Sequence, residues 1–465
     1  MSLGEYLGRI NSLMKGTGQK FFYVTTFGCQ MNEYDSERMA RLMAGKGFVR
    51  TDDIARADFI LLNTCSIREK AEQKVYSFLG RLKPLKEANP NLIIGVGGCL
   101  AQQYGAKLLR RVPFLDLVLG THGVHRLPEL FEKVAKTRRP VCWTDFDYDL
   151  SPPPPLVREQ ASVKAFLTIM QGCDNFCTYC VVPYVRGRET SRKPGDILAE
   201  ARDLLAHGVK EITLLGQNVN SYGRGLEERC SFVELIHQVA SLSGLERLRF
   251  TTSHPKDLSP GLIRAVAEVG PLCEHVHLPV QSGSTRILKA MSRGYTREAY
   301  LEKVEALREA CPDVALTTDI IVGFPGETEA DFRTTMDLLD QVRFDGIYSF
   351  KYSDRPMTRA SKLAGRLDEE VKGRRLAELQ AAQREITLRL NMALIGTKAE
   401  VLVEGRSKRR PDQLTGRTRS NKIVNFTGPE HLVGKPAYPV IQEAWANSLR
   451  GTLDEALAAR ALWRS

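Results

Sequence analysis

Three cysteines stand close together in the middle of the chain. Cys173, Cys177 and Cys180 lie in GCDNFCTYC, directly after a strand-like run. Three thiolates in so short a loop face a common point, and a [4Fe–4S] cluster is normally held by four. A three-thiolate site therefore leaves one iron without a protein ligand. That iron is open to the amine and carboxylate of a small molecule, and S-adenosylmethionine carries both groups on its methionine end.

A structural zinc site is the alternative use of such a loop. Zinc sites of this kind usually have a fourth Cys or His at suitable spacing, commonly as two C-x2-C pairs. No second pair follows in the sequence. The ligand count therefore favours an iron–sulfur cluster.

A second trio of cysteines is spread over the first hundred residues. Cys29 (FGCQMN), Cys65 (NTCSI) and Cys99 (GGCLAQ) each come at the end of a predicted strand. Parallel strands end at the same edge of their sheet, where ligands of open α/β sheets bind. We expect the fold to bring the three thiols together there. The alternative is three buried core cysteines, a common fate of free Cys. Small or polar residues flank the trio, namely Gly28, Asn32, Asn63, Ser66, Gly97 and Gly98.

The other four cysteines show no shared pattern, and we expect structural or surface thiols at Cys142, Cys230, Cys273 and Cys311.

The elements that position the second trio alternate between strand and helix. Strand-like runs and helical runs in turn indicate a parallel sheet covered by helices. We assign residues 20–137 to this domain and 138–158 to a proline-rich linker, because the prolines at 152–155 exclude a helix or a central strand. The expected strands are 21–28, 58–64, 91–98 and 114–120, and the expected helices are 33–44 and 67–85.

Residues 159–394 repeat the alternation about six times. A complete eight-unit barrel needs about 250 residues, so the length favours a partial, open (β/α)6 barrel. A charged helical segment ends it at 366–394. The expected strands are 163–170, 211–216, 245–250, 274–280, 314–323 and 346–353, and the helices between them include 196–206 and 296–310.

The tail, 395–452, has short alternating segments between Gly and Pro, the pattern of a small all-β barrel. It carries a basic cluster, and the chain has a net charge of +11, which suits a polyanionic partner. We expect this cluster to bind RNA; the alternative is a solvated charged face. The cluster consists of Lys408, Arg409, Arg410, Arg417, Arg419 and Lys422.

The composition indicates a cytoplasmic protein of several domains. The 465 residues exceed what one core usually serves. No apolar run approaches the roughly 18–20 residues that span a bilayer, and the first residues lack the apolar region of a signal peptide. Ten cysteines in a reducing compartment are not expected to form disulfides.

With these motifs in view, the chain resembles the radical S-adenosylmethionine superfamily, whose motif is C-x3-C-x-aromatic-C with Tyr179 as the aromatic residue. Within it, the chain resembles the MiaB-type methylthiotransferases from about residue 21 to 444, and its tail resembles their RNA-binding TRAM domain, a barrel of OB type. The stretches that carry the likeness are FGCQMNEYDSE, CDNFCTYCVVPYVRGRETSR, LLGQNVNSYG, TSHPKDL, HLPVQSGSTRILKAMSRGYT and DIIVGFPGET.

The resemblance implies two [4Fe–4S] clusters, an auxiliary one on Cys29, Cys65 and Cys99 and a radical one on the other trio. It implies S-adenosylmethionine as second cofactor and methylthiolation of adenine C2 in N6-isopentenyladenosine, next to the anticodon of tRNA. The expected partners are a tRNA anticodon stem-loop and an electron donor of flavodoxin or ferredoxin type, with no membrane and a monomeric chain. Alternatives are a sibling enzyme acting on threonylcarbamoyladenosine or on a ribosomal-protein aspartate, and a non-catalytic iron–sulfur RNA sensor.

Several further residues are candidates by family analogy. We expect the backbone at Tyr179 to lie near the cofactor adenine. Arg186 and Arg188 are either surface charges or contacts to phosphate or cofactor, and His254 and His277 are expected to be packed or hydrogen-bonded rather than catalytic. The other residues expected near S-adenosylmethionine are Gln217, Gln281, Ser282 and Asp319, with Asn218, Gly323 and Glu327 also at predicted strand ends.

One departure from the family pattern concerns a turn. Family members commonly have Tyr-Ser-x-Arg-Pro-Gly-Thr, whereas Met357 replaces the glycine here. Only glycine adopts a left-handed conformation readily, so the sequence puts a left-handed turn in doubt.

Overall fold

The computed structural model describes residues 18–65, 69–147, 149–155 and 162–453. Ser66 and the expected helix start at Ile67 lie outside the described residues, as do positions 148 and 156–158 of the expected linker. Within these ranges no helix combines the length and the apolar character that crossing a membrane requires.

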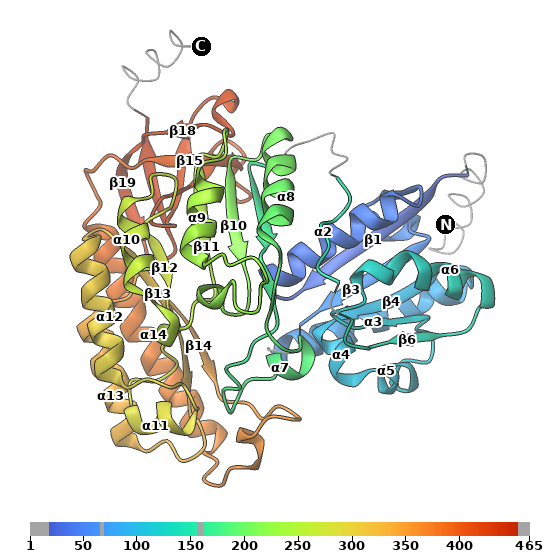
Figure 1. Cartoon of the computed structure of the whole chain (residues 1–465), viewed down its shortest axis with the longest axis horizontal. Coiled ribbons are helices and arrows are strands. Elements are labelled where there is room, and N and C mark those ends of the chain that lie inside the picture. The colour runs from blue at the N-terminus through green and yellow to red at the C-terminus, as the bar shows by residue number, and fades with distance from the viewer. Residues whose placement is uncertain (1–17, 66–68, 148, 156–161, 454–465) are drawn as a thin grey trace. The chain divides into compact units, whose positions relative to one another are not determined.

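A six-stranded, all-parallel sheet forms the N-terminal domain (Figure 1). Its strand order is β2-β1-β3-β4-β5-β6. Residues of β3 and β4 are buried throughout, as expected for parallel strands covered on both faces. The strands are β1 (Lys20–Phe27), β2 (Phe48–Arg50), β3 (Phe59–Thr64), β4 (Ile93–Gly98), β5 (Leu117–Leu119) and β6 (Val141–Trp143).

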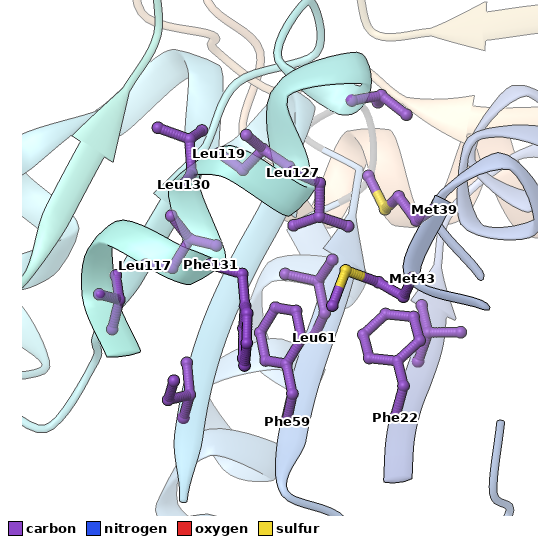
Figure 2. Close-up of a cluster of buried hydrophobic side chains, with 14 of the residues drawn as sticks. Phe22, Met39, Met43, Phe59, Leu61, Leu117, Leu119, Leu127, Leu130 and Phe131 are labelled. Carbon is purple, nitrogen blue, oxygen red and sulfur yellow. The ribbon is translucent and has the colours of Figure 1, made fainter. Parts of the chain in front are cut away.

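Helices cover both faces of this sheet. On one face, α2 (Gln30–Ala44) and α6 (Leu127–Thr137) pack on a core whose aromatic rings include Phe22, Phe59 and Phe131 (Figure 2). On the other face, the side chains of α3 (Glu69–Ala88), α4 (Cys99–Tyr104) and α5 (Ala106–Arg111) join a second core. Because the strands of this sheet run parallel, their carboxyl ends lie at the same edge.

Six parallel strands form the barrel that follows. They make two three-stranded sheets, β11-β10-β7 and β12-β13-β14, joined by a parallel bridge between Leu248 and Leu272. Within the described residues β7 and β14 are not paired, so the barrel is open, as expected. The strands are β7 (Lys164–Thr168), β10 (Glu211–Leu215), β11 (Arg247–Phe250), β12 (His275–His277), β13 (Ala315–Val322) and β14 (Gly346–Lys351).

Helices lie between the barrel strands, and most begin with a recognisable cap. Ser231, Ser259, Thr296 and Thr328 each accept a backbone N–H at a helix start, which satisfies an otherwise unpaired donor. The helices are α8 (Pro194–Ala206), α9 (Phe232–Ala240), α10 (Pro260–Glu268), α11 (Thr285–Ala290), α12 (Arg297–Ala310), α13 (Glu329–Val342) and α14 (Glu369–Met392); β8 (Met170–Gln171), α7 (Val182–Val185) and β9 (Thr190–Ser191) lie between β7 and α8.

The C-terminal β-domain has six strands in the order β18-β15-β16-β17-β20-β19, of which β17 and β20 are parallel. The residues before β15 bridge to Val440 at the start of β19 through Lys398, which closes the sheet into a small barrel. The strands are β15 (Val401–Arg406), β16 (Leu414–Thr418), β17 (Ile423–Thr427), β18 (Pro436–Ala437), β19 (Val440–Trp445) and β20 (Ser448–Thr452).

Two buried arginines of β11 attach this β-domain to the barrel. Arg247 donates from Nη1 to the carbonyl oxygen of Arg417 at 2.6 Å, and Arg249 donates to the carbonyls of Thr418 and Arg419 at 2.8 Å each. These donors satisfy carbonyls at the β16–β17 turn. The turn is therefore bound to the N-terminal ends of the barrel strands.

The chain forms two compact units whose boundary crosses the C-x3-C-x2-C loop. The first unit contains the N-terminal sheet domain together with Gln171–Asp174 and Val181–Arg192. The second contains the barrel and the C-terminal β-domain, including Asn175–Cys180. Cys173 thus belongs to the first unit, and the other two cysteines of the loop belong to the second.

The expected strands are all present, and one further strand lies within the segment expected to be a linker. Val141–Trp143 pair with β5 as β6, inside the 138–158 segment expected to be a linker. The prolines at 152–155 do lie outside helices and strands. Three-residue strands such as β6 are too short to show a period in the sequence.

Candidate iron–sulfur sites

The first trio of thiols lies at one edge of the N-terminal sheet, as expected. Cys29 is the N-cap of α2, Cys65 follows the last residue of β3, and Cys99 follows β4 as the first residue of α4. The strands β1, β3 and β4 are neighbours in register, with Thr64 opposite both Phe27 and Gly98. Topology therefore joins three residues separated by more than thirty positions each along the chain.

Two glycines allow the backbone to approach at this edge. Gly98 has φ +89°, and a Cβ there would collide with the Asn63 side chain and the Thr64 backbone. A Cβ on Gly28 would lie 2.6 Å from Asn32 Oδ1. Asn32 in turn donates to Asn63 Oδ1 at 3.0 Å. Of the small and polar residues expected around the thiols, Gly28, Asn32, Asn63 and Gly98 thus lie in close contact.

The three thiols differ in their protonation. A hydrogen bond from Cys65 and the charge of Arg186 lower the pKa of Cys29 to about 6, against the opposing cost of partial desolvation. Asn32 Oδ1 also lies 3.2 Å from Cys29 Sγ. Burial raises the pKa of Cys99. The thiolate is the metal-binding form of cysteine, so this edge already favours one thiolate at neutral pH.

A buried arginine accompanies the trio. The Arg186 side chain is 3% exposed, and its Nη2 donates to Asp35 Oδ2 at 2.8 Å. Burial opposes its charge, but Cys99, Asp35 and Cys29 raise the pKa of Arg186. The surface interpretation was therefore wrong for Arg186. It holds for Arg188, whose side chain is 70% exposed and pairs with Asp174.

Of the four cysteines without a shared pattern, Cys230, Cys273 and Cys311 are buried and Cys142 is half-buried. Burial raises the pKa of each of them, and that of Cys273 reaches about 11. A thiol that stays protonated is a poor nucleophile and metal ligand. The lowered pKa distinguishes Cys29 from these four cysteines, whereas Cys99 shares their raised pKa.

The second trio lies in the loop that crosses the unit boundary. In the first unit, Cys173 donates its N–H to the carbonyl of Gly187 at 3.2 Å. Gly172, just before it, has φ +81°, and a Cβ there would collide with the Arg188 carbonyl. Only glycine fits such a position.

In the second unit, another buried arginine lies beside the loop. Arg293 Nη1 is 3.4 Å from Cys177 Sγ and 3.5 Å from Tyr179 Oη, while Nη2 donates to the Pro279 carbonyl at 2.7 Å. Arg293 also donates to Tyr295 at 2.9 Å. These contacts of the Arg293 guanidinium are a backbone carbonyl, two tyrosine hydroxyls and the Cys177 sulfur, and none of these groups is a carboxylate.

These surroundings fit iron–sulfur clusters. Within the described residues, Nη1 of Arg186 is buried without a hydrogen-bond acceptor, and cluster sulfides are acceptors of this kind. Among the same residues no three Cys, His, Asp or Glu side chains converge on a single ion. In a [4Fe–4S] cluster each thiolate binds a separate iron, so three thiols that hold a cluster need not converge on one point as ligands of a single zinc ion do.

The residues expected near S-adenosylmethionine lie on the barrel but differ in setting. Gln217 follows β10, and Gln281, with φ +77°, bridges to Ile320 of β13. Asp319 lies inside β13 rather than at its end. Ser282 is fully buried, and its hydroxyl accepts the Ser284 N–H at 3.2 Å, so it shapes the start of α11.

The two candidate histidines are packed and hydrogen-bonded, as expected. His254 Nδ1 accepts the Lys256 N–H at 3.3 Å, and burial, with Arg293 and Lys256, lowers the pKa of His254 to about 2. His277 Nδ1 lies 3.0 Å from Thr317 Oγ1, and its Nε2 lies 3.5 Å from Asp319. His254 is therefore neutral at physiological pH.

Ionic and hydrogen-bonding contacts of Glu327 hold the loop after β13, and the turn at Met357 has a left-handed backbone conformation. Glu327 accepts the Gly323 N–H at 2.7 Å and pairs with buried Arg375 at the same distance. Met357 has φ +73°, so the left-handed turn that the sequence put in doubt is present.

The predicted basic cluster divides into two groups. Lys408, Arg409 and Arg410 are exposed in the loop between β15 and β16. Arg419 pairs with Glu274 of the barrel, and Lys422 pairs with Asp345 at 2.7 Å. Arg417 pairs with Glu404 at 3.3 Å. The last three are held by intramolecular ion pairs.

Sequence reasoning missed two residues of these sites. Asp35 stands inside α2, and Arg293 stands in the MSRGYT stretch. No period or spacing marks either one. A buried charge is costly unless it is paired, but burial becomes visible only in the structure.

Comparison with known proteins identifies the family. Models of the radical SAM superfamily, of the uncharacterized protein family UPF0004 and of the TRAM domain match residues 167–339, 21–120 and 393–453. The chain is 52% identical over 440 residues to the tRNA-2-methylthio-N(6)-dimethylallyladenosine synthase of Syntrophus aciditrophicus, covering 94% of this chain and 95% of that protein. The chain belongs to this synthase family.

A second synthase of this family is as similar in sequence to the chain as the first. The synthase of Geobacter metallireducens is 52% identical over 441 residues, which cover 94% of this chain and 99% of that protein. Among solved structures, the radical S-adenosylmethionine methyltransferase TsrM from Kitasatospora setae has a TM-score of 0.56 at 13% identity, covering 74% and 75% of the two chains. That likeness concerns the fold alone.

Proposed function

We propose that this chain is a radical S-adenosylmethionine enzyme that methylthiolates C2 of N6-dimethylallyladenosine, also called N6-isopentenyladenosine, next to the anticodon of tRNA. The observation that carries the proposal is the trio of Cys29, Cys65 and Cys99 at one sheet edge, in addition to the radical motif. The names of relatives that are 52% identical support the substrate.

The chemistry explains why a radical route is needed. The C–H bond at adenine C2 is not acidic enough for an ordinary general base. When bound, two [4Fe–4S] clusters and S-adenosylmethionine supply the one-electron chemistry and the methylthio group. We propose that Cys29, Cys65 and Cys99 hold the auxiliary cluster, and that the trio of the loop holds the other.

The chain's own residues hold and orient these groups. Tyr179, Gln217, Gln281 and Asp319 are proposed to line the S-adenosylmethionine site. Gln217 lies at the carboxyl end of a strand, where barrel sites form, and Gln281 bridges to Ile320, next to Asp319 on β13. Tyr179 belongs to the cysteine loop itself. Ser282 is proposed to contribute to the S-adenosylmethionine site indirectly, because its hydroxyl holds the backbone before α11 by accepting the Ser284 N–H. Both cysteine trios have to reach the same nucleobase for the reaction to occur.

We propose a division of labour among the domains. Residues 20–137 carry the auxiliary cluster, 138–158 connect, 159–394 carry the radical chemistry, and 395–452 bind RNA. The exposed group Lys408–Arg410 is the proposed contact to the tRNA backbone. Of the wider cluster, Arg419 and Lys422 support it by pairing with carboxylates of the barrel, and Arg417 by pairing with Glu404 inside the β-domain.

The proposed partners follow from this reaction. They are the tRNA anticodon stem-loop and a one-electron donor of flavodoxin or ferredoxin type. We propose that the enzyme acts as a monomer in the cytoplasm, where its substrate is found.

A sibling substrate is the second candidate. The sequence pattern left open threonylcarbamoyladenosine in tRNA and a ribosomal-protein aspartate. The synthase names of the relatives do not favour either.

The test uses a bacterial host that lacks its own enzyme of this kind. Expression of the chain is expected to convert N6-isopentenyladenosine into its 2-methylthio form, measured by mass spectrometry of tRNA nucleosides. The Cys29→Ala/Cys65→Ala/Cys99→Ala variant is expected to lose that product and about half of the reconstituted iron, since one of two clusters is gone. A change in the threonylcarbamoyl derivative alone, or unchanged iron in the variant, would refute the proposal.

A further inference from the structure

Arg186 and Asp35 form a buried ion pair inside the auxiliary cysteine site. Their side chains are 3% and 11% exposed and meet at 2.8 Å. Both charges act on Cys99, and Arg186 also acts on Cys29. The pair is therefore close enough to the thiols to change the electrostatic potential at any cluster they hold.

Arg186 is fixed in this place by its backbone. Thr121 donates from Oγ1 to the Val185 carbonyl at 2.5 Å, and His122 Nε2 lies 3.1 Å from the Arg186 carbonyl. Val185 and Val181 pack against Cys99. The arginine is thus tied to the end of β5, and its position does not depend on the ion pair alone.

We propose that Arg186 and Asp35 are positioning residues that set the reduction potential of the auxiliary cluster, with opposite signs. This inference depends on the proposed function, because it requires that cluster. Arg186 favours the reduced state, and Asp35 offsets the effect. Neither residue is proposed to react.

The physical basis is the charge of the two cluster states. Reduction from [4Fe–4S]²⁺ to [4Fe–4S]⁺ adds one electron, and net charge and hydrogen bonds to sulfur set its potential. Arginine stays protonated in proteins. Burial limits screening by solvent and salt. A neutral residue at 186 therefore makes reduction harder, and a neutral residue at 35 makes it easier.

The experiment isolates the auxiliary cluster in the full-length chain. The parent is the Cys173→Ala/Cys177→Ala/Cys180→Ala variant, which leaves a single cluster after anaerobic reconstitution. Its potential is measured with dithionite as reductant and EPR of the reduced cluster as readout. The same measurement is made on Arg186→Gln, Asp35→Asn and their combination in this parent.

We expect opposite shifts. Arg186→Gln should move the potential to more negative values, Asp35→Asn to more positive values, and the double variant should return close to the parent. Arg188→Gln is the matched control, since it removes an exposed charge two positions away and should leave the potential unchanged. Arg186→Lys should restore much of the parent value, because the charge is kept.

The outcomes separate this inference from the proposed function. A parent that binds no iron would contradict the auxiliary cluster itself. If the parent holds its cluster, two results would contradict the proposed opposite effects of Arg186 and Asp35. One is a potential that Asp35→Asn leaves unchanged, and the other is a shift in the same direction in both single variants. If the Arg186→Gln variant does not hold its cluster, the potentials of Asp35→Asn and Arg186→Lys still show whether the two charges shift the reduction potential in the proposed directions.

Discussion

The pKa of a cysteine thiol in this protein depends on the groups that surround it. At Cys29, a neighbouring thiol and an arginine lower the thiol pKa to about 6, whereas burial raises that of Cys273 to about 11. Sequence position predicted that Cys29, Cys65 and Cys99 would share one edge of the sheet, because each follows the end of a parallel strand. It did not reveal the counter-charges, since Asp35 and Arg293 follow no pattern in the sequence.

Met357 leads to a prediction at this scale. It is the third residue of a turn in which Thr358 donates to the Arg355 carbonyl at 3.3 Å, with Pro356 second. Such a turn needs a positive φ at its third position, which costs a non-glycine residue about 1–2 kcal/mol. Since Met357 is 52% exposed, Met357→Gly loses little packing.

We therefore expect Met357→Gly to stabilise the protein by about 0.5–1 kcal/mol, after the larger chain entropy of glycine is subtracted. Chemical denaturation measures the change. Met357→Ala is the control, because it shortens the side chain but keeps the strain. Equal stability of the two variants would show that the turn stores no strain.

At the scale of elements, the order of strands explains how the first trio assembles. Alternating strand and helix patterns predicted β1, β3 and β4, and the parallel arrangement placed their ends together. The bounds were less predictable. Short β2 and β6 form because they pair with existing edges of the sheet, and that information is tertiary.

The start of α13 offers a prediction at this scale. Asp331 completes a capping box with Thr328, accepts from Ser284 at 2.6 Å and pairs with Arg286. Burial opposes its ionisation, but the hydrogen bonds from Arg286, Ser284 and Thr328 hold the pKa of Asp331 well below its usual range. We expect Asp331→Ala to cost about 2 kcal/mol.

The pH dependence of this loss has a definite sign. A carboxylate with a lowered pKa stabilises the fold above its unfolded pKa of about 4 and loses this effect as the pH falls. The stability difference between wild type and Asp331→Ala should thus be constant above pH 5 and shrink below pH 4. Asp337→Ala, on the exposed side of α13, should change stability little at any pH.

At the scale of the whole chain, half of the cations predicted to bind RNA form ion pairs within the protein. Charge in the sequence does not distinguish a cation that faces solvent from one that pairs with a distant carboxylate. Arg419 and Lys422 are partners of Glu274 and Asp345, which lie more than seventy residues away. The order of parallel sheet, barrel and small β-domain was predictable from the pattern of strands and helices, whereas these ion pairs were not.

The exposed group at the β15–β16 loop gives the prediction for this scale. Lys408→Ala/Arg409→Ala/Arg410→Ala should weaken tRNA binding and lower the slope of log affinity against log salt by about 2–3, since each phosphate contact contributes roughly 0.7–0.9. Filter binding at several salt concentrations measures it. The matched control is Arg374→Ala/Arg384→Ala/Arg389→Ala, which removes three exposed charges of α14. An equal effect of both variants would mean that only net charge matters.

The position of Arg186 along the chain limits how sequence segments can be exchanged between members of this family. The residue lies in Val181–Arg192, a segment encoded after the second cysteine trio, yet it belongs to the first compact unit. Grafting the first 157 residues of one relative onto the remainder of a distant one would separate Asp35 from its native counterpart. Such chimeras should retain function only when the two segments are exchanged together, so modular shuffling is constrained across this junction.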